Sequence, residues 1–260
     1  MDLMGVINDS VRYPFSDWKK ILLLGIFILL GNLGPVILFI GTFIGLKNLY
    51  LTLPISIIAY VLFGFIINGY KFKIIKTSLE GISELPDFNN WIEIVINGIK
   101  VSLVVIFYCI PTILILIYAA ISFLPILVSH PSIDVHLILS ILSGFILVLF
   151  ALLYLIIIMP INYMAITHMV HNDGKLSMAF RFGEIFEKIG RIGWINLLVW
   201  YIVTGVISIV ISVTGGVIST VFSILTPGVG LIINSLIVSP YNYMFLNRSI
   251  ALCYMSENIK

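Results

Sequence analysis

Charged side chains are scarce in this sequence, since Lys, Arg, Asp and Glu make up only 10% of its 260 residues. Soluble domains carry roughly 25% charged residues and about 45–50% apolar ones, whereas hydrophobic residues reach 60% here. A soluble fold of this length cannot hide so much apolar surface, because a large part of any fold faces water. The composition therefore excludes an ordinary soluble domain and indicates an integral membrane protein.

Cysteines and catalytic motifs are also scarce. Cys109 and Cys253 lie far apart in the sequence, which argues against a structural disulfide and against a metal cluster. The chain has no HExxH, GxSxG or P-loop motif. The net charge of +2 is dispersed and gives no sign of a nucleic-acid partner. We therefore expect no enzyme activity, no cofactor, no bound metal and no nucleic acid.

Five long runs contain no charged residue: 21–46, 48–70, 101–133, 135–172 and 192–247. A bilayer core of about 30 Å takes roughly 20 helical residues, and Thr226-Pro227-Gly228 marks a turn within the last run. We predict an all-α fold, a single membrane domain over residues 1–260. It is a polytopic integral membrane bundle of six transmembrane helices near 21–45, 50–72, 101–127, 136–168, 194–222 and 229–254. We expect no charged side chain within any span, which argues against a pump or a proton-coupled carrier.

The distribution of Lys and Arg predicts the orientation of these spans. With the N-terminus inside the cell, all but one of the 14 basic residues fall on the cytoplasmic side, and Lys47 is the exception. Loops on the cytoplasmic side of a membrane carry an excess of basic residues. We therefore expect a multi-pass protein of the cell membrane with both termini in the cytoplasm.

Three segments that precede spans are amphipathic: Asp2–Arg12, Asn89–Lys100 and Leu176–Ile192. In the third, polar residues recur every three or four positions, on one face of a helix: Ser177, Arg181, Glu184, Lys188 and Arg191. Helices of this kind lie in the membrane interface with the apolar face towards lipid. We therefore predict three interfacial amphipathic helices.

The even-numbered spans end alike, with Ile67-Asn68-Gly69-Tyr70, Pro160-Ile161-Asn162-Tyr163-Met164 and Pro240-Tyr241-Asn242-Tyr243-Met244. We hypothesise a threefold repeat of an amphipathic helix plus a transmembrane hairpin, with units 2–76, 86–171 and 176–254. The polar endings either line a cytoplasmic vestibule or pack helices together. The residues concerned are Asn68, Tyr70, Asn162, Tyr163, Asn242 and Tyr243.

His168 and His171 lie one helical turn apart near the inner end of the fourth span. Such a pair can share a metal, but zinc requires three or four ligands, and no carboxylate sits at matching spacing within the helix. The alternative is two polar residues at the membrane interface. The pattern favours that alternative, so no metal site is predicted.

Three stretches carry a family resemblance: Tyr13-Pro14-Phe15-Ser16-Asp17-Trp18-Lys19-Lys20, Gly69-Tyr70, and Glu84-Leu85-Pro86-Asp87-Phe88-Asn89-Asn90-Trp91. The element L-P-x-F-x-x-W, from Leu85 to Trp91, is the most specific. With these stretches the chain resembles domain-of-unknown-function family 4013, a family of archaeal multi-pass membrane proteins. The resemblance implies a helical membrane fold and an archaeal source, and it implies no activity.

The sequence favours a non-enzymatic protein that organises or binds membrane components through its interfacial helices. Its expected partners are membrane lipids, together with other membrane proteins or further copies of itself. A first alternative is an uncoupled channel or facilitator for a small or amphipathic solute, lined by the Asn and Tyr side chains. A second alternative is a lipid-acting enzyme at the cytoplasmic face, which would depend on His168 or His171.

Overall fold

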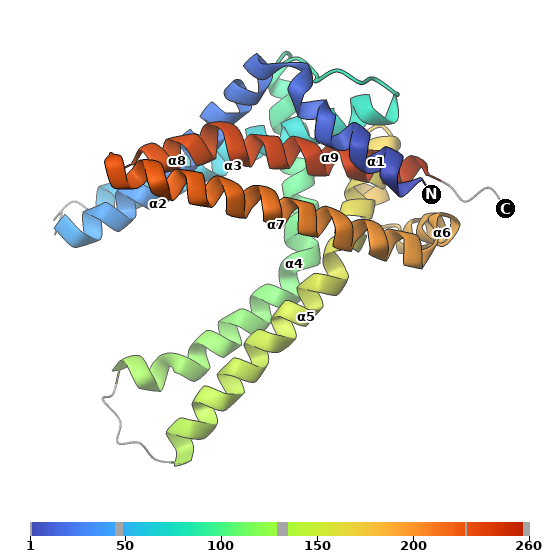
Figure 1. Cartoon of the computed structure of the whole chain (residues 1–260). Helices are drawn as coiled ribbons and strands as arrows, with labels where there is room; N and C mark the ends of the chain where they lie inside the picture. The colour runs from blue at the N-terminus through green and yellow to red at the C-terminus, as the bar shows by residue number, and fades with distance from the viewer. Residues whose placement is uncertain (1, 45–48, 129–134, 227, 257–260) are drawn as a thin grey trace.

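The computed structural model describes residues 2–44, 49–128, 135–226 and 228–256, and every regular element in these ranges is helical (Figure 1). This confirms the all-α class. The α-helices are α1 (Leu3–Arg12), α2 (Trp18–Ile44), α3 (Leu49–Leu79), α4 (Trp91–Val128), α5 (Val135–His171), α6 (Phe182–Ile192), α7 (Trp194–Leu225), α8 (Val229–Ile233) and α9 (Ser239–Met255). Two 3₁₀ helices, η1 (Tyr13–Ser16) and η2 (Leu176–Phe180), and a π-helical turn, η3 (Asn234–Val238), complete the described elements.

Within the described residues, five helical stretches are long and apolar enough to cross a membrane. They are Leu53–Leu79, Trp91–Leu124, Leu137–His171, Trp194–Ile224 and Val229–Met255, and they coincide with the second to sixth predicted spans. The first predicted span, 21–45, falls on α2, whose side chains beyond Leu33 lie outside the described residues. The architecture is consistent with a helical membrane bundle of five candidate spans, and the sixth stays a prediction.

The three predicted amphipathic helices fare differently. α1 forms separately, with its first turn capped where Asp2 Oδ1 accepts a hydrogen bond from Gly5 N at 3.0 Å. The separate helix predicted at 89–100 is wrong, because α4 runs unbroken from Trp91 to Val128. Helices propagate through polar residues when nothing interrupts the backbone hydrogen bonds, and residues 91–101 contain no proline. The helix predicted at 176–192 is also corrected, since Arg181 with ψ 74° separates η2 from α6.

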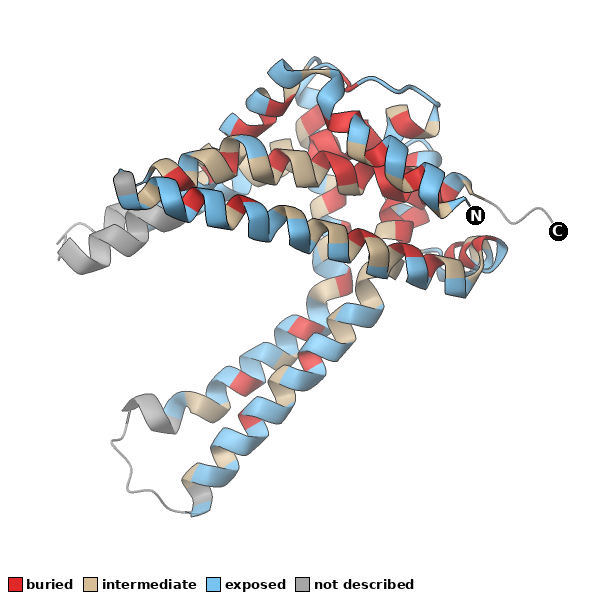
Figure 2. Ribbon diagram, viewed as in Figure 1, coloured by how far each residue is buried: buried red, intermediate tan, exposed pale blue. Residues whose placement is uncertain are grey.

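The packed core lies at one end of the molecule, where the ends of the long helices meet α1 and α6 (Figure 2). α3, α4, α5, α6 and α7 each contribute a fully buried side chain to this core: Ile75, Val104, Met169, Ile189 and Trp200. The apolar face of α6 therefore packs largely on protein, and Phe182 and Phe186 are the side chains of that face that stay exposed. This corrects the expectation that the whole apolar face of the segment lies against lipid.

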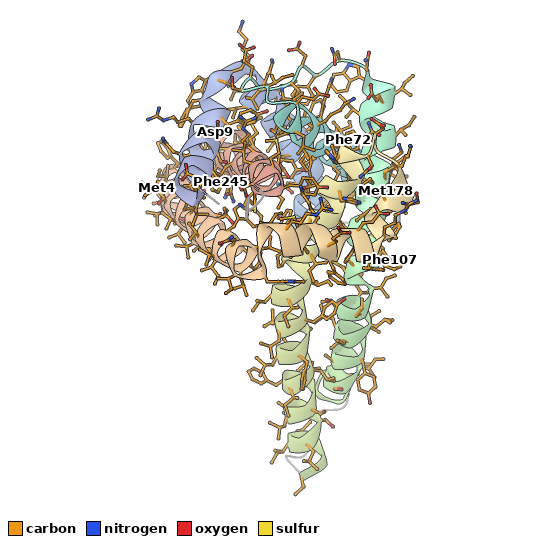
Figure 3. All side chains as sticks on the ribbon, turned by 90° about the vertical axis from the view of Figure 1, so that its right-hand side faces the viewer. Met4, Asp9, Phe72, Phe107, Met178 and Phe245 are labelled. Atoms are coloured by element: carbon orange, nitrogen blue, oxygen red, sulfur yellow. The ribbon has the colours of Figure 1, made fainter. Side chains whose placement is uncertain are left out.

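The far halves of α4 and α5 project from this core as a paired hairpin, away from α2, α3 and α7 to α9 (Figure 1). Many of their side chains project outwards along its length (Figure 3). Large apolar residues there are exposed, with Leu114 at 61%, Phe145 at 66% and Ile157 at 66%. Apolar exposure on this scale is unfavourable in water and is ordinary for helices that face lipid.

The stretches that carry the family resemblance meet in space around the segment between α3 and α4. Tyr70 Oη donates a hydrogen bond to Pro86 O at 3.0 Å, and its ring stacks on Phe88 with centroids 3.9 Å apart. Lys20 Nζ donates to Leu85 O at 2.6 Å and pairs with Asp87 at 2.8 Å. The hydrogen bond from Lys20 lowers the pKa of the Asp87 carboxyl. The L-P-x-F-x-x-W element therefore fixes the position of the segment that connects α3 to α4.

Arg248 of α9 anchors the N-terminal helix. Its side chain is nearly buried, with Nε 2.7 Å from Asp9 Oδ1 and Nη1 donating to Ile82 O at 2.6 Å. The guanidinium also lies over the Tyr13 ring, 4.8 Å from its centroid. One buried cation thereby joins α1, the segment after α3 and α9.

α3 and α4 touch through their backbones at two glycines. A Cβ on Gly69 would overlap the carbonyl oxygen of Ile94, and one on Gly98 would overlap that of Phe65. Small residues let helices approach closely, which matters in lipid because burial of apolar surface gives no drive for helices to associate. Close packing of α3 against α4 therefore explains the glycine in the Asn-Gly-Tyr ending of the second span.

This contact predicts that one methyl group added at either glycine strongly destabilises the protein. Gly69→Ala and Gly98→Ala should each lower the midpoint of thermal unfolding in detergent, because the carbonyl oxygens on the facing backbone cannot move aside. The expected loss is about 1–3 kcal/mol, the usual cost of overpacking.

Gly64→Ala is the matched control on α3, since nothing lies within 4 Å of a Cβ at that position. Its higher helix propensity should leave stability unchanged or raise it, by up to about 1 kcal/mol. Equal midpoints for Gly69→Ala and Gly64→Ala would show that the helices do not meet as described.

Candidate functional site

Two of the three Asn-Tyr endings meet directly. Tyr243 Oη donates a hydrogen bond to Ile67 O at 3.0 Å and lies 3.3 Å from Asn68 Oδ1. Asn68 Nδ2 in turn donates to Ser102 Oγ of α4 at 3.0 Å. These bonds tie α9, α3 and α4 together, which is the packing role that the sequence left open beside the vestibule.

The other members of the set lie around this contact or apart from it. Tyr163 of α5 packs edge-on against Trp200, with centroids 6.3 Å apart, whereas Tyr70 faces the α3–α4 connection. Asn162 Oδ1 and Asn242 Oδ1 are buried with no hydrogen-bond partner among the described residues. The structure thus brings Asn68 and Tyr243 together, and Tyr70 belongs to the same apolar cluster as Tyr243 while its hydroxyl bonds elsewhere. The vestibule and the threefold repeat remain predictions.

Lys71 is the unexpected member of this region. Its side chain is 7% exposed, and its Nζ lies 4.7 Å from the centroid of the Tyr163 ring. The ion pairs that the described chain forms all involve other cations. The expectation that no charged side chain lies within a span is therefore wrong, because Lys71 lies within Leu53–Leu79 and the buried Arg248 lies within Val229–Met255. Sequence position placed Lys71 at the membrane edge, and only the packed core shows it to be buried.

His168 and His171 have different surroundings. His168 Nδ1 is 2.8 Å from Tyr254 Oη, and its Nε2 is 3.2 Å from Glu184 Oε2. The His171 ring packs against Tyr254, with centroids 5.5 Å apart. No cluster of three His, Cys, Asp or Glu residues suited to a metal occurs among the residues that the structure places. The partners of His168 come from α6 and α9, so sequence spacing could not reveal them.

Glu184 completes this network through Arg181, whose Nη1 is 2.6 Å from Glu184 Oε1. The Arg181 hydrogen bond, and after it the His168 hydrogen bond, lowers the pKa of the Glu184 carboxyl. A carboxyl with a lowered pKa stabilises the fold above its ordinary pKa, and this contribution is lost as the pH falls through the lowered value. The network therefore attaches α6 to α5 and α9 at neutral pH.

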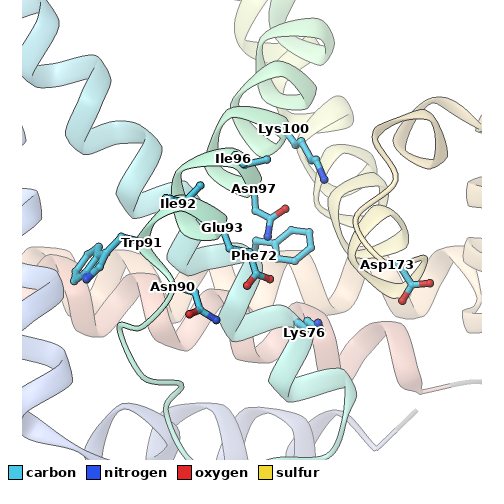
Figure 4. Close-up of a pocket in the computed structure, with 10 residues that line it drawn as sticks. All are labelled: Phe72, Lys76, Asn90, Trp91, Ile92, Glu93, Ile96, Asn97, Lys100 and Asp173. Atoms are coloured by element: carbon cyan, nitrogen blue, oxygen red, sulfur yellow. The ribbon is translucent and has the colours of Figure 1, made fainter.

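A groove of about 820 Å³ opens between the end of α3, the start of α4 and the turn after α5 (Figure 4). Two cations and two carboxylates line it: Lys76, Lys100, Glu93 and Asp173. Two amides, Asn90 and Asn97, and four apolar side chains, Phe72, Trp91, Ile92 and Ile96, complete the lining. The groove combines polar groups of both charge signs with an apolar wall.

Local backbone structure explains the shape of the groove. α5 ends in a Schellman-type turn, in which Gly174 N donates to Met169 O at 3.0 Å and Asp173 adopts φ 55°. Lys100 Nζ donates to Gly174 O at 2.9 Å and so holds this turn against α4. A Cβ on Gly174 would lie 2.8 Å from Phe72 Cζ, so the glycine lets the turn approach the groove floor.

Sequence patterns showed only part of this site. In the second amphipathic segment polar residues recur every three or four positions, and this pattern predicts only a polar face turned away from lipid: Asn90, Glu93, Asn97 and Lys100. Phe72, Lys76 and Asp173 come from two other elements and carry no motif. The groove therefore depends on contacts between distant segments, and these contacts cannot be identified from one sequence.

The buried Lys71 yields a stability prediction. Lys71→Met keeps an unbranched side chain of similar length and removes a charge that has no carboxylate partner in the described chain. We expect the free energy of unfolding in detergent to rise by on the order of 1 kcal/mol. Lys175→Met, on an exposed residue, should change it little. A lower unfolding midpoint for Lys71→Met than for the unaltered protein would contradict this assignment.

Comparison with known proteins places the chain in a family. Residues 51–220 match the family described as protein of unknown function (DUF4013), and this range contains every residue of the groove. An uncharacterised protein of the archaeon Methanocaldococcus jannaschii is 25% identical over 233 residues, covering 79% of this chain and 74% of the relative. No solved structure matches the chain. Because the family match covers more than half of the sequence, the chain belongs to the DUF4013 family.

Proposed function

We propose that this protein is a non-enzymatic membrane protein that binds lipid in the groove at the start of α4. By doing so it organises membrane components at its basic side. The observation that carries the proposal is a groove of about 820 Å³ with charged and amide groups inside and exposed apolar side chains at its mouth. Sites for amphiphiles combine these two kinds of surface.

An exposed apolar stripe continues from the groove mouth along α4. Its members are spaced alternately four and three residues apart, so they share one face of the helix: Ile92, Ile96, Ile99, Leu103, Ile106 and Ile110. Each is between 38% and 78% exposed. An acyl or isoprenoid chain can lie along this stripe while its headgroup occupies the groove. The arrangement suits one lipid molecule that is bound at both ends.

The proposed setting is a cell membrane crossed six times, with both termini in the cytoplasm. The five apolar helices support the membrane location, and the distribution of basic residues supports the orientation. In this orientation Lys76 and Lys100 lie on the cytoplasmic side. That places the groove at the depth of the inner headgroups, where an amphiphile changes from polar to apolar.

The contacts of His168 favour binding over lipid chemistry. Both of its ring nitrogens lie within hydrogen-bond distance of side chains, Tyr254 and Glu184. A histidine that acted on lipid would need a ring nitrogen directed towards the substrate. The hydrogen bond between Tyr243 and Asn68 likewise supports packing over a solute pathway.

The orientation is testable by cysteine labelling in cells. In a background with Cys109 and Cys253 replaced by Ala, Thr226→Cys should react with a membrane-impermeant maleimide added outside. Glu80→Cys and Lys175→Cys, both at exposed positions, should react only after the cells are opened. Labelling of Lys175→Cys in intact cells would contradict the proposed orientation.

Lipid binding is testable by native mass spectrometry of the protein purified in mild detergent. We expect the unaltered protein to retain phospholipid adducts, and a variant with Lys76→Gln and Lys100→Gln to retain several-fold fewer. Lys19→Gln with Lys175→Gln is the matched control, because both lysines are exposed on the same basic side and neither lines the groove. Equal retention by the two double variants would show that lipid binds elsewhere.

A further inference from the structure

Two cations and two carboxylates line the groove, so its formal charges balance. Lys76 and Lys100 face a space that Glu93 and Asp173 also line. The ion pairs of the described chain all involve other residues, so these four groups do not neutralise one another directly. Lys100 Nζ donates a hydrogen bond to Gly174 O, and the side chains of Lys76, Glu93 and Asp173 are exposed. All four formal charges are therefore accessible to a ligand.

Asn97 gives a second, independent indication of a ligand. Its side chain is only 8% exposed and lines the groove beside Phe72 (Figure 4). No hydrogen bond joins its side-chain amide to another group in the described ranges, and the polar atoms of the amide stay accessible from the groove. A nearly buried donor and acceptor therefore faces the groove from α4, next to Lys100 one turn further along the helix.

We infer that the groove binds a zwitterionic phospholipid headgroup, a phosphodiester joined to a primary amine. This inference rests on the proposed lipid-binding function. The phosphodiester lies against Lys76 and Lys100, and the Asn97 amide donates to one of its oxygens. The ammonium group lies against Glu93 and Asp173. Both charges of the headgroup then meet opposite charges, and the unpartnered amide gains a hydrogen bond.

Charge balance selects this class over simpler ligands. A headgroup with a phosphate and no amine would pair with the two lysines but would leave the two carboxylates unpaired beside its negative charge. A free cation would meet two ammonium groups in the same way. Like charges near each other disfavour binding, so a site with two groups of each sign prefers a ligand that carries both. The apolar stripe on α4 explains why the ligand is a lipid and not a free amino acid.

The test compares two lipids with identical chains, a phosphatidylethanolamine and a phosphatidylglycerol. They are added in equal amounts to the full-length protein after delipidation in detergent, and bound adducts are counted by native mass spectrometry. We expect the ethanolamine lipid to be retained about fivefold more than the glycerol lipid, the preference that an exposed ion pair can give. Glu93→Gln with Asp173→Asn should abolish the preference without abolishing binding.

Two controls separate the possible outcomes. Asp173→Asn alone should keep the fold, because Asn also tolerates positive φ, and it should reduce the preference partially. Glu187→Gln removes an exposed carboxylate on α6 outside the groove and should leave the preference unchanged. Equal retention of both lipids, or a preference that survives loss of both carboxylates, would overturn the headgroup assignment and leave lipid binding intact. Retention of neither lipid would refute the proposed function itself.

Discussion

The backbone contact between α3 and α4 is the constraint on which the rest of the described structure depends. Gly69 and Gly98 each face a carbonyl oxygen of the opposite helix, so the crossing point cannot slide without a clash. This crossing brings Phe72 and Lys76 of α3 next to Asn97 and Lys100 of α4, and all four side chains line the groove. The groove therefore depends on Gly69 and Gly98, which allow α3 and α4 to approach closely.

Polar contacts reinforce this crossing at both ends. On one side, Lys20 and Tyr70 hold the segment between the two helices through its carbonyl oxygens. On the other, Asn68 joins Ser102 and Tyr243 across three helices. In lipid, hydrogen bonds and close packing replace the hydrophobic effect as the main forces between helices. The buried core and these polar contacts lie at the same end, whereas the exposed apolar hairpin of α4 and α5 lies beyond it.

Much of the helical architecture was predictable, because long charge-free runs require lipid and helices of matching length. The runs located five spans, but they made the helices too short at the predicted cytoplasmic side. α3 continues through three lysines to Leu79, and α4 begins at Trp91 rather than near 101. Charge marks the edge of a bilayer, whereas a helix ends where its hydrogen bonds end, and the two do not coincide here.

The candidate site was less predictable, for a physical reason. Glu93, Asn97 and Lys100 stood out as one polar stripe, but a stripe alone does not show whether it faces water, lipid or protein. The facing residues, Lys76 and Asp173, reach the groove only because the α3–α4 crossing and the turn after α5 bring them there. The burial of Lys71 and the partners of His168 are hidden for the same reason.

The most direct test of lipid binding is an electron cryo-microscopy structure of the full chain in a nanodisc that contains phosphatidylethanolamine. We predict headgroup density in the groove between Lys100 and Asp173, continuous with chain density along Ile92 and Ile96. Lipid in the groove should be better ordered than lipid along the exposed face of α7. A groove that holds only water, or that is closed by its own side chains, would contradict the account.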